Sequence, residues 1–250
     1  MNRPMETSGP QINGQLSIIS LLTPDQYKHY PYLTPFRGLV NATFRAQASD
    51  GLFSSDVVRL KTDDQLCAEL GGDYFMYILS SPIPSDGAPR LYASASGKPY
   101  TPKVFTGGVP KDHTMAFQRT EEFDMENEEV WELKVLVVDP TLQKKGLGTL
   151  LLNLVEAEVA KRVAEKQLQL LKMEDLANSG TEEANGEHRT GVHVPKNKKA
   201  ILTLDAIREI NEGYYVRRGF VTTEIRAQRK GTLGSNREWE TVWMQKDVTS

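Results

Sequence analysis

The sequence is poor in cysteine and contains no long apolar run. Cys67 is the one cysteine among 250 residues, so the chain cannot form an internal disulfide and a reducing compartment is expected. No run of about 18 apolar residues occurs, and the first 15 residues are polar and lack the apolar segment of a signal peptide. We therefore expect no membrane partner and a location in the cytoplasm or the nucleus.

The chain also lacks an excess of basic residues and any histidine pattern typical of metal sites. Its formal net charge is −3, which argues against a dedicated nucleic-acid binder. The four histidines show no metal-ligand spacing and fall in loops or polar stretches; they are His29, His113, His188 and His193. We expect neither a nucleic-acid partner nor a bound metal.

The composition is that of a globular protein with one sizeable core, since 39% of the residues are hydrophobic and 25% are charged. Residues 1–14 are expected to form a disordered leader, and residues 15–250 a single domain. Two polar loop insertions are expected within this domain, at about 96–129 and 174–199. The second has almost no apolar residues and cannot bury enough surface to offset its ordering entropy.

Hydrophobic periodicity and turn residues predict an α/β chain with a mixed sheet. Helices are expected in a Pro-broken region from 24 to about 47, at 62–70, and from the glycine loop to about 173. Strands are expected at 16–22, 74–79, 90–95, 130–138, 200–207, 221–226 and 238–244. No internal repeat is visible.

The most informative segment is residues 130–152, in which an apolar strand and a Pro-marked turn lead through a glycine loop into an apolar-periodic helix. Gly146 and Gly148 allow backbone N–H groups to approach a ligand closely. The first turn of the helix adds unpaired N–H donors and a partial positive charge. The segment is neither a P-loop nor a dinucleotide-binding loop, because it lacks the Lys-Ser/Thr pair and the third glycine that those motifs need. A phosphate or pyrophosphate site is predicted.

The loop Gln143-Lys144-Lys145-Gly146-Leu147-Gly148 resembles the Q/R-x-x-G-x-G/A pyrophosphate loop of the GNAT N-acetyltransferase superfamily. A second segment agrees: Tyr215, Gly219 and Phe220 resemble the Y-x-x-x-G-F element that follows the family's fifth strand. The two segments span about residues 130–220, less the second insertion. The resemblance implies a central mixed sheet flanked by helices.

The resemblance also implies acetyl-CoA as co-substrate and a set of residues that bind it. The strand before the loop is expected to diverge from the next one, so that its free backbone groups hold the pantetheine arm and polarise the thioester carbonyl. The implied contacts are Leu136, Val137, Val138, Gln143, Lys144, Lys145, Gly146, Leu147, Gly148 and Thr149. Asn211 is a weaker candidate, because the family's asparagine lies seven residues before the tyrosine, where this chain has Arg208.

Two residues are candidates for proton transfer. Glu132 lies on the strand eleven residues before Gln143, the offset that the resemblance gives to a general base. A carboxylate partly withdrawn from water there suits that role, although it could instead be a rim glutamate paired with a Lys or Arg. Tyr215 corresponds to the general acid that protonates the leaving thiolate, or is a core tyrosine bonded to a backbone carbonyl.

The sequence thus predicts an acetyl-CoA-dependent N-acetyltransferase, an acyltransferase in which a primary amine attacks the thioester directly in a ternary complex. The alternative is a non-catalytic CoA-binding sensor or scaffold with the same fold. Several acceptors stay open: a protein lysine, a protein N-terminus, a polyamine or an amino sugar. The acidic run from Glu121 to Glu129 either steers a cationic amine to the site or is a solvated linker.

Overall fold

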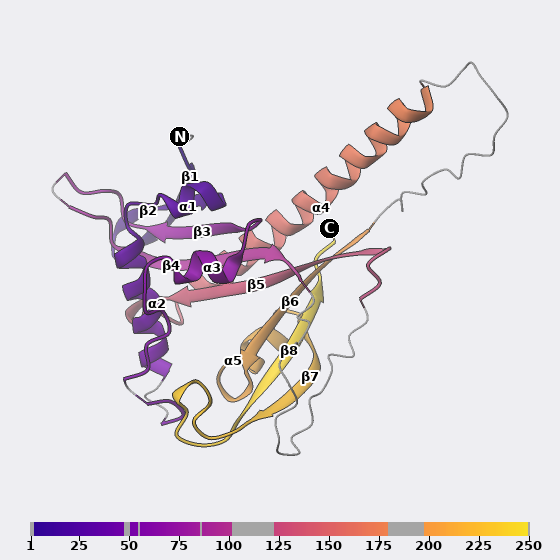
Figure 1. Cartoon of the computed structure of the whole chain (residues 1–250). Helices are drawn as coiled ribbons and strands as arrows, with labels where there is room; N and C mark the ends of the chain where they lie inside the picture. The colour runs from indigo at the N-terminus through magenta and orange to yellow at the C-terminus, as the bar shows by residue number, and fades with distance from the viewer. Residues whose placement is uncertain are drawn as a thin grey trace.

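The computed structural model describes residues 3–47, 51–54, 56–85, 87–101, 123–179 and 198–249. Eight strands form one sheet in the order β1-β2-β3-β4-β5-β6-β8-β7 (Figure 1). All neighbours are antiparallel except β5 and β6, which are parallel. The strands are β1 Met5–Ile12, β2 Gln15–Leu22, β3 Phe75–Ser80, β4 Leu91–Pro99, β5 Glu128–Val138, β6 Lys199–Ile207, β7 Val221–Gln228 and β8 Trp239–Asp247. The predicted mixed α/β sheet is confirmed.

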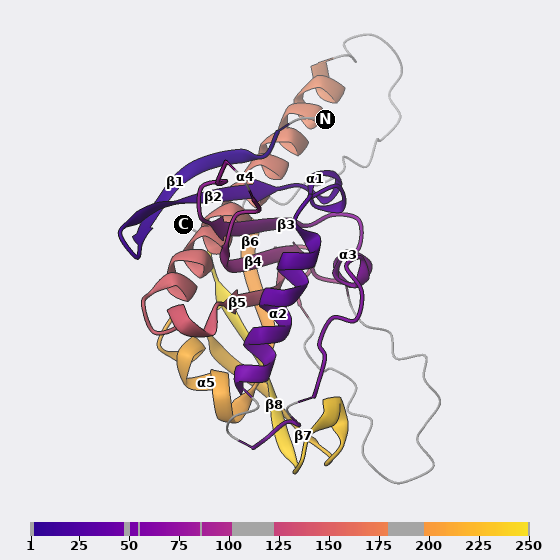
Figure 2. The ribbon, with the colours of Figure 1, turned by 90° about the vertical axis from the view of Figure 1, so that its left-hand side faces the viewer.

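Helices cover both faces of the sheet (Figure 2). On one face lie α1 Pro24–Lys28, α2 Leu33–Gln47 and α3 Gln65–Leu70; on the other lie α4 Leu147–Ser179 and α5 Arg208–Val216. Short 3₁₀ turns occur at η2 Pro140–Leu142 and η3 Thr232–Gly234. In the described part of the chain, no helix is long and apolar enough to cross a membrane.

The two faces bury separate apolar cores, and β5 contributes to both. Trp131 and Leu133 belong to the core under α4, whereas Val135 and Val137 belong to the core under α2. This switch follows from a bulge, since the register with β4 shifts between Leu133 and Val135. A β-bulge re-aims the side chains beyond it. The bulge lies where β5 approaches the site described below.

The prediction of a disordered leader over residues 1–14 is wrong, because β1 pairs antiparallel with β2. The strand lies at the edge of the sheet with mostly exposed side chains, so it does not need the apolar alternation that marks half-buried strands. Asn13 and Gly14 both have positive φ, 52° and 81°, as in a two-residue type I′ hairpin. This Asn-Gly pair was the overlooked signal.

Helix α4 continues beyond the predicted end near Met173 and reaches Ser179, so the first six residues of the predicted 174–199 insertion are helical. Those residues include Glu174, Leu176 and Ala177, and Glu, Leu and Ala all have high helix propensity. Figure 1 shows this end of α4 projecting past the sheet. Residues 180–197, and residues 102–122 of the other predicted insertion, lie outside the described residues.

Candidate functional site

The site is built where β5 and β6 separate. Their parallel ladder runs from Glu128 opposite Lys199 to Glu132 opposite Thr203. Beyond that rung β6 continues to pair with β8 on its other side, while β5 continues to Val138 beside β4. Within the described residues, the edge of β5 from Leu133 onward therefore has no ladder partner on the β6 side. The two strands diverge visibly in Figure 1.

A cavity of about 460 Å³ occupies this divergence. The strands β5 and β6 form two of its walls, α2 and α5 contribute further side chains, and the turn between β7 and β8 lies at its outer end. Leu136, Val137 and Asn211, all predicted cofactor contacts, line it together with Tyr215. The sequence prediction that β5 diverges from the next strand therefore agrees with the geometry.

The glycine loop follows directly from the open end of β5. The Asp139 carboxylate accepts hydrogen bonds from the Thr141 backbone N–H at 2.9 Å and from the Arg90 guanidinium at 2.8 Å. Burial would raise the pKa of this carboxyl, but the bonds from Arg90 and Thr141 outweigh it and lower the pKa. The turn into the loop is thus fixed by a charged aspartate.

The loop directs backbone donors outward. Lys144 and Gly146 have positive φ, 62° and 84°, and the Leu150 N–H is bonded to the Gly146 carbonyl at 3.0 Å. The N–H groups of Leu147, Gly148 and Thr149 belong to the first turn of α4, where an α-helix offers them no internal acceptor. Such a turn favours an anion. The exposed side chains of Lys144 and Lys145 stand beside it.

Gly148 is closely packed. A Cβ at this position would lie 3.0 Å from the Tyr214 hydroxyl and 3.7 Å from a Val138 methyl group, so a larger residue would require the Tyr214 side chain to shift. Gln143 donates from Nε2 to the Val138 carbonyl at 3.4 Å. The side chain of Gln143 thus ties the loop back to β5.

Arg218 lies beside the same helix start and was missed by the sequence prediction. Its guanidinium stands 3.5 Å from the centre of the Tyr214 ring and donates to the Tyr214 carbonyl at 2.8 Å. It also donates to the Thr149 hydroxyl. A positive charge therefore lies at the first turn of α4. The sequence feature that could have indicated Arg218 is its position directly before Gly219 and Phe220.

Tyr215 is buried and faces the cavity. Its ring packs edge-on against Tyr214, with ring centres 5.0 Å apart, and against Phe220, at 5.5 Å. Burial raises the pKa of its hydroxyl, and the charge of Asp205 adds to this effect. The phenol is consequently protonated at neutral pH, the form that a proton donor needs.

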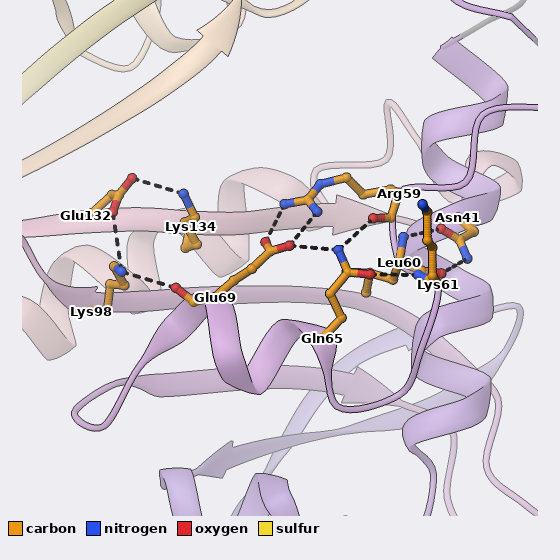
Figure 3. Close-up of polar contacts among 9 residues, drawn as sticks. All are labelled: Asn41, Arg59, Leu60, Lys61, Gln65, Glu69, Lys98, Glu132 and Lys134. Carbon is orange, nitrogen blue, oxygen red and sulfur yellow. Dashed lines mark hydrogen bonds and ion pairs between the residues drawn. The ribbon is translucent and has the colours of Figure 1, made fainter. Parts of the chain in front are cut away.

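Glu132 lies on the last rung before the strands separate, with only 2% of its surface exposed. Its carboxylate is 3.3 Å from Lys134 Nζ and 3.9 Å from Lys98 Nζ (Figure 3). Lys98 also donates to the Glu69 carbonyl at 3.2 Å. Lys134 lines the cavity, whereas Glu132 is not among the described residues that do. The lysine pairing considered for Glu132 in the sequence is therefore present.

A second ion pair lies toward α2. The Arg59 guanidinium donates to both carboxylate oxygens of Glu69, and Gln65 donates to the same carboxylate at 2.9 Å (Figure 3). The hydrogen bond from Arg59 is the main reason that the pKa of Glu69 is lowered. Arg59 lines the cavity, but its charge is already matched. No local pattern in the sequence indicates this pair.

Residues 90–178 match the family described as "Acetyltransferase (GNAT) family". The match spans β4, β5, the glycine loop and nearly all of α4. It confirms the resemblance to the GNAT superfamily: residues 90–178 carry the signature of this acetyltransferase family. The mixed sheet flanked by helices is the arrangement that the resemblance implied. The family supports acetyl transfer as the general activity.

Solved structures similar to the chain include acetyltransferases of several kinds. The ribosomal-protein-S18-alanine N-acetyltransferase from Escherichia coli is 16% identical over 94% of this chain and 95% of that one, with a TM-score of 0.47. Aminoglycoside 6'-acetyltransferase type Ii is 15% identical over 92% and 96%, with a TM-score of 0.44. NAA60 from Arabidopsis thaliana, solved with acetyl-CoA, is 14% identical over 93% and 99%, also at 0.44. No curated protein sequence matches the chain significantly.

Proposed function

We propose that the chain is an acetyl-CoA-dependent N-acetyltransferase that transfers the acetyl group to a primary amine by direct attack in a ternary complex. One observation carries the proposal: a single strand, β5, supplies an open edge to a cavity containing Tyr215 and then leads directly into an anion-binding helix start. An acyl-CoA has an anionic pyrophosphate at one end of a pantetheine arm and a thioester at the other, and this arrangement suits both.

The residues present fit the co-substrate. The N–H groups of Leu147, Gly148 and Thr149 would hold the pyrophosphate, helped by the charges of Lys144 and Lys145. The open edge of β5 at Leu136 to Val138 would bond the amide groups of the pantetheine arm, as a neighbouring strand would. Asn211 lines the far wall of the same cavity and is proposed to contact the arm.

The transfer itself needs little covalent chemistry from the protein. The amine nitrogen forms a bond to the acetyl carbon, the C–S bond breaks, the amine loses one proton and the thiolate gains one. A backbone N–H of β5 aimed at the carbonyl oxygen would stabilise its developing negative charge, an effect worth about 3 kcal/mol in comparable sites. Tyr215 is proposed to donate the proton to the thiolate.

Glu132 is proposed to take the proton of the amine, directly or through water. In support, it is the carboxylate on β5 at the point where the cavity begins. It is bonded to Lys134, whose side chain lines that cavity.

The second candidate is a CoA-binding sensor or scaffold without turnover. The observation that favours it is that Glu132 is paired with Lys98 and Lys134 and is not itself among the described residues that line the cavity. A carboxylate held in this way could be structural alone. The cofactor-binding features would be the same in both cases.

Two measurements separate the candidates. Calorimetry with acetyl-CoA tests the co-substrate, and release of free CoA across a panel of primary amines tests turnover. Binding together with amine-dependent CoA release is expected. Binding without release on any amine would favour the scaffold, and absence of binding would contradict both.

A further inference from the structure

The carbonyl of Val138, the last residue of β5, points away from β4. The Asp139 N–H, which belongs to the same peptide unit, donates to the carbonyl of Tyr92 in β4 at 2.8 Å. In a trans peptide the C=O and the N–H point in opposite directions, and no cis peptide bond occurs among the described residues. The Val138 carbonyl therefore lies on the open edge of β5, where the arm of acetyl-CoA is proposed to bind.

This carbonyl already faces a hydroxyl from another element. The Oγ1 atom of Thr43 in α2 lies 3.2 Å from the Val138 carbonyl oxygen, and Figure 1 shows β5 ending beside α2. The Gln143 side chain approaches the same oxygen at 3.4 Å. Thr43 is buried, with 4% of its surface exposed, and lines the cavity, whereas Val138 is not among the described residues that do. The hydroxyl therefore covers the carbonyl from the cavity side.

The Thr43 hydroxyl has two acceptors but only one hydrogen. Its Oγ1 atom also lies 3.0 Å from the Leu39 carbonyl, one turn earlier in α2, an acceptor that threonine side chains often use in helices. A hydroxyl donates a single hydrogen, so it bonds well to one of the two carbonyls at a time. The Leu39 carbonyl does not depend on it, because the α-helix pattern already supplies the Thr43 N–H. The hydrogen can therefore leave Val138 and still keep an acceptor.

We propose that Thr43 is a positioning residue that holds the Val138 carbonyl while the site is empty and yields it to the co-substrate. This inference rests on the proposed function and concerns how the pantetheine arm is received. An amide N–H of the arm replaces the hydroxyl as the donor to Val138, and the hydroxyl turns to Leu39. No polar group loses its partner in either state. The hydroxyl thus stabilises the empty site and competes with the arm.

Thr43→Val separates this role from a purely structural one, because the two roles predict opposite changes in affinity. Valine keeps the β-branched shape but leaves the Val138 carbonyl of the empty protein without the hydroxyl donor, so urea should unfold the variant more readily. The arm then supplies the missing donor without competition. The Kd for acetyl-CoA, measured by calorimetry, should fall about 3- to 10-fold, the fold-change of one neutral hydrogen bond. A residue that only supports the fold would lower stability and affinity together.

Matched variants show whether the hydroxyl is responsible. Thr43→Ser keeps the hydroxyl and should return the Kd to that of the unaltered protein, whereas Thr43→Ala lacks it and should also bind acetyl-CoA more tightly. Thr34→Val removes an exposed hydroxyl of the same helix, which donates to Asp63 at 2.6 Å, and should leave the Kd unchanged. Adenosine 3′-phosphate 5′-diphosphate, the nucleotide end of CoA without the arm, should show no gain with Thr43→Val.

The outcomes distinguish this inference from the proposed function. Tighter binding of acetyl-CoA by Thr43→Val, together with lower stability of the empty variant, supports the role of Thr43. Unchanged or weaker binding, or an equal gain for the nucleotide without the arm, would overturn that role and leave the proposed function intact. If acetyl-CoA does not bind to the unaltered protein, the proposed function fails and this inference with it.

Discussion

The two sides of the cavity are built in different ways. The side proposed to hold the cofactor comes from one continuous stretch, β5 and the glycine loop, and offers mainly backbone groups: an open strand edge and the N–H donors at the start of α4. The opposite side, proposed to receive the acceptor, comes from α2, β6, residues 232–239 and α5, and offers side chains such as Asp205 and Leu233.

The two sides should respond differently to amino-acid substitutions. Backbone donors depend on chain geometry, so only a residue that blocks or bends the chain removes them. The acceptor side depends on the identity of side chains from several segments, so single substitutions there can alter its charge and size. A substitution that disturbs the backbone of the proposed cofactor side should therefore abolish binding there. Substitutions on the proposed acceptor side should change binding in smaller steps.

The largest effect on acetyl-CoA binding is expected from Gly148→Glu. Its Cβ would meet the Tyr214 hydroxyl at 3.0 Å, and its carboxylate would oppose the anion. We expect calorimetry to detect no binding of acetyl-CoA, with cooperative unfolding retained. Gly72→Glu is the control, because a Cβ there meets nothing within 4 Å. Unchanged affinity of Gly148→Glu would remove the pyrophosphate assignment.

Glu132→Gln tests whether the buried carboxylate at the boundary between the two sides moves a proton. If Glu132 is the base, turnover should fall about 10²- to 10⁴-fold with little change in acetyl-CoA affinity. The loss should shrink at high pH, where more of the amine is already neutral. Glu129→Gln is the matched control, since Glu129 lies on the same strand and pairs with Lys166 at 2.8 Å. Reduced stability with normal turnover would make Glu132 a structural residue.

Tyr215→Phe should lower turnover less than Glu132→Gln, because the CoA thiolate can leave without being protonated. We expect turnover to fall roughly 10–100-fold, below the usual range for a general acid, with the affinity for acetyl-CoA retained because the ring still packs against Phe220. Tyr214→Phe should reduce turnover much less, since its hydroxyl lies toward Gly148. Equal losses in single-turnover measurements would mean that the acid is assigned to the wrong tyrosine.

The smallest effect is expected at the ion pair of Arg59 and Glu69. Because the pKa of Glu69 is lower in the folded protein than its ordinary value of about 4.3, the pair stabilises the fold above that pH, and this contribution is lost as the pH falls through the folded value. Arg59→Met should cost about 1 kcal/mol or less at pH 7, as for other partly exposed pairs.

Urea unfolding of the Arg59→Met variant and the unaltered protein at pH 7 and at about pH 3.5 measures this contribution. The difference in stability should shrink at the lower pH. Arg45→Met replaces an exposed arginine of α2 and serves as the control. A difference that does not depend on pH would mean that Arg59 acts through packing alone.

The contrast between the two sides also explains what the sequence could predict. The glycine loop, the preceding strand and Tyr215 were predicted because each motif is local, and its residues keep their spacing in the fold. The bulge near Leu133 gave no sign in the sequence, although it decides which side of the sheet Val135 and Val137 face.

The acceptor side could not be predicted, because its residues meet only through tertiary structure. Asp205, Arg59 and Leu233 come from three separate segments, and no spacing rule connects them. The edge strand β1 was missed for the opposite reason: its Asn13-Gly14 signal is local, but the polar strand before it was mistaken for a disordered leader. Pairing at a sheet edge needs backbone partners more than apolar side chains.

The contact between residues 51–54 and 231–239 has a consequence for the order in which the chain folds. The Asn236 side chain donates to the Gly51 carbonyl across 185 positions of the chain, so a very long loop must close before this contact forms. Contacts of such high sequence separation are slow to form in folding. This contact should therefore form last in folding. We expect the amides of residues 51–54 and 231–239 to exchange their hydrogens faster than those of β3 and β4. The cofactor side would then exist, and could be filled, before the acceptor side is complete.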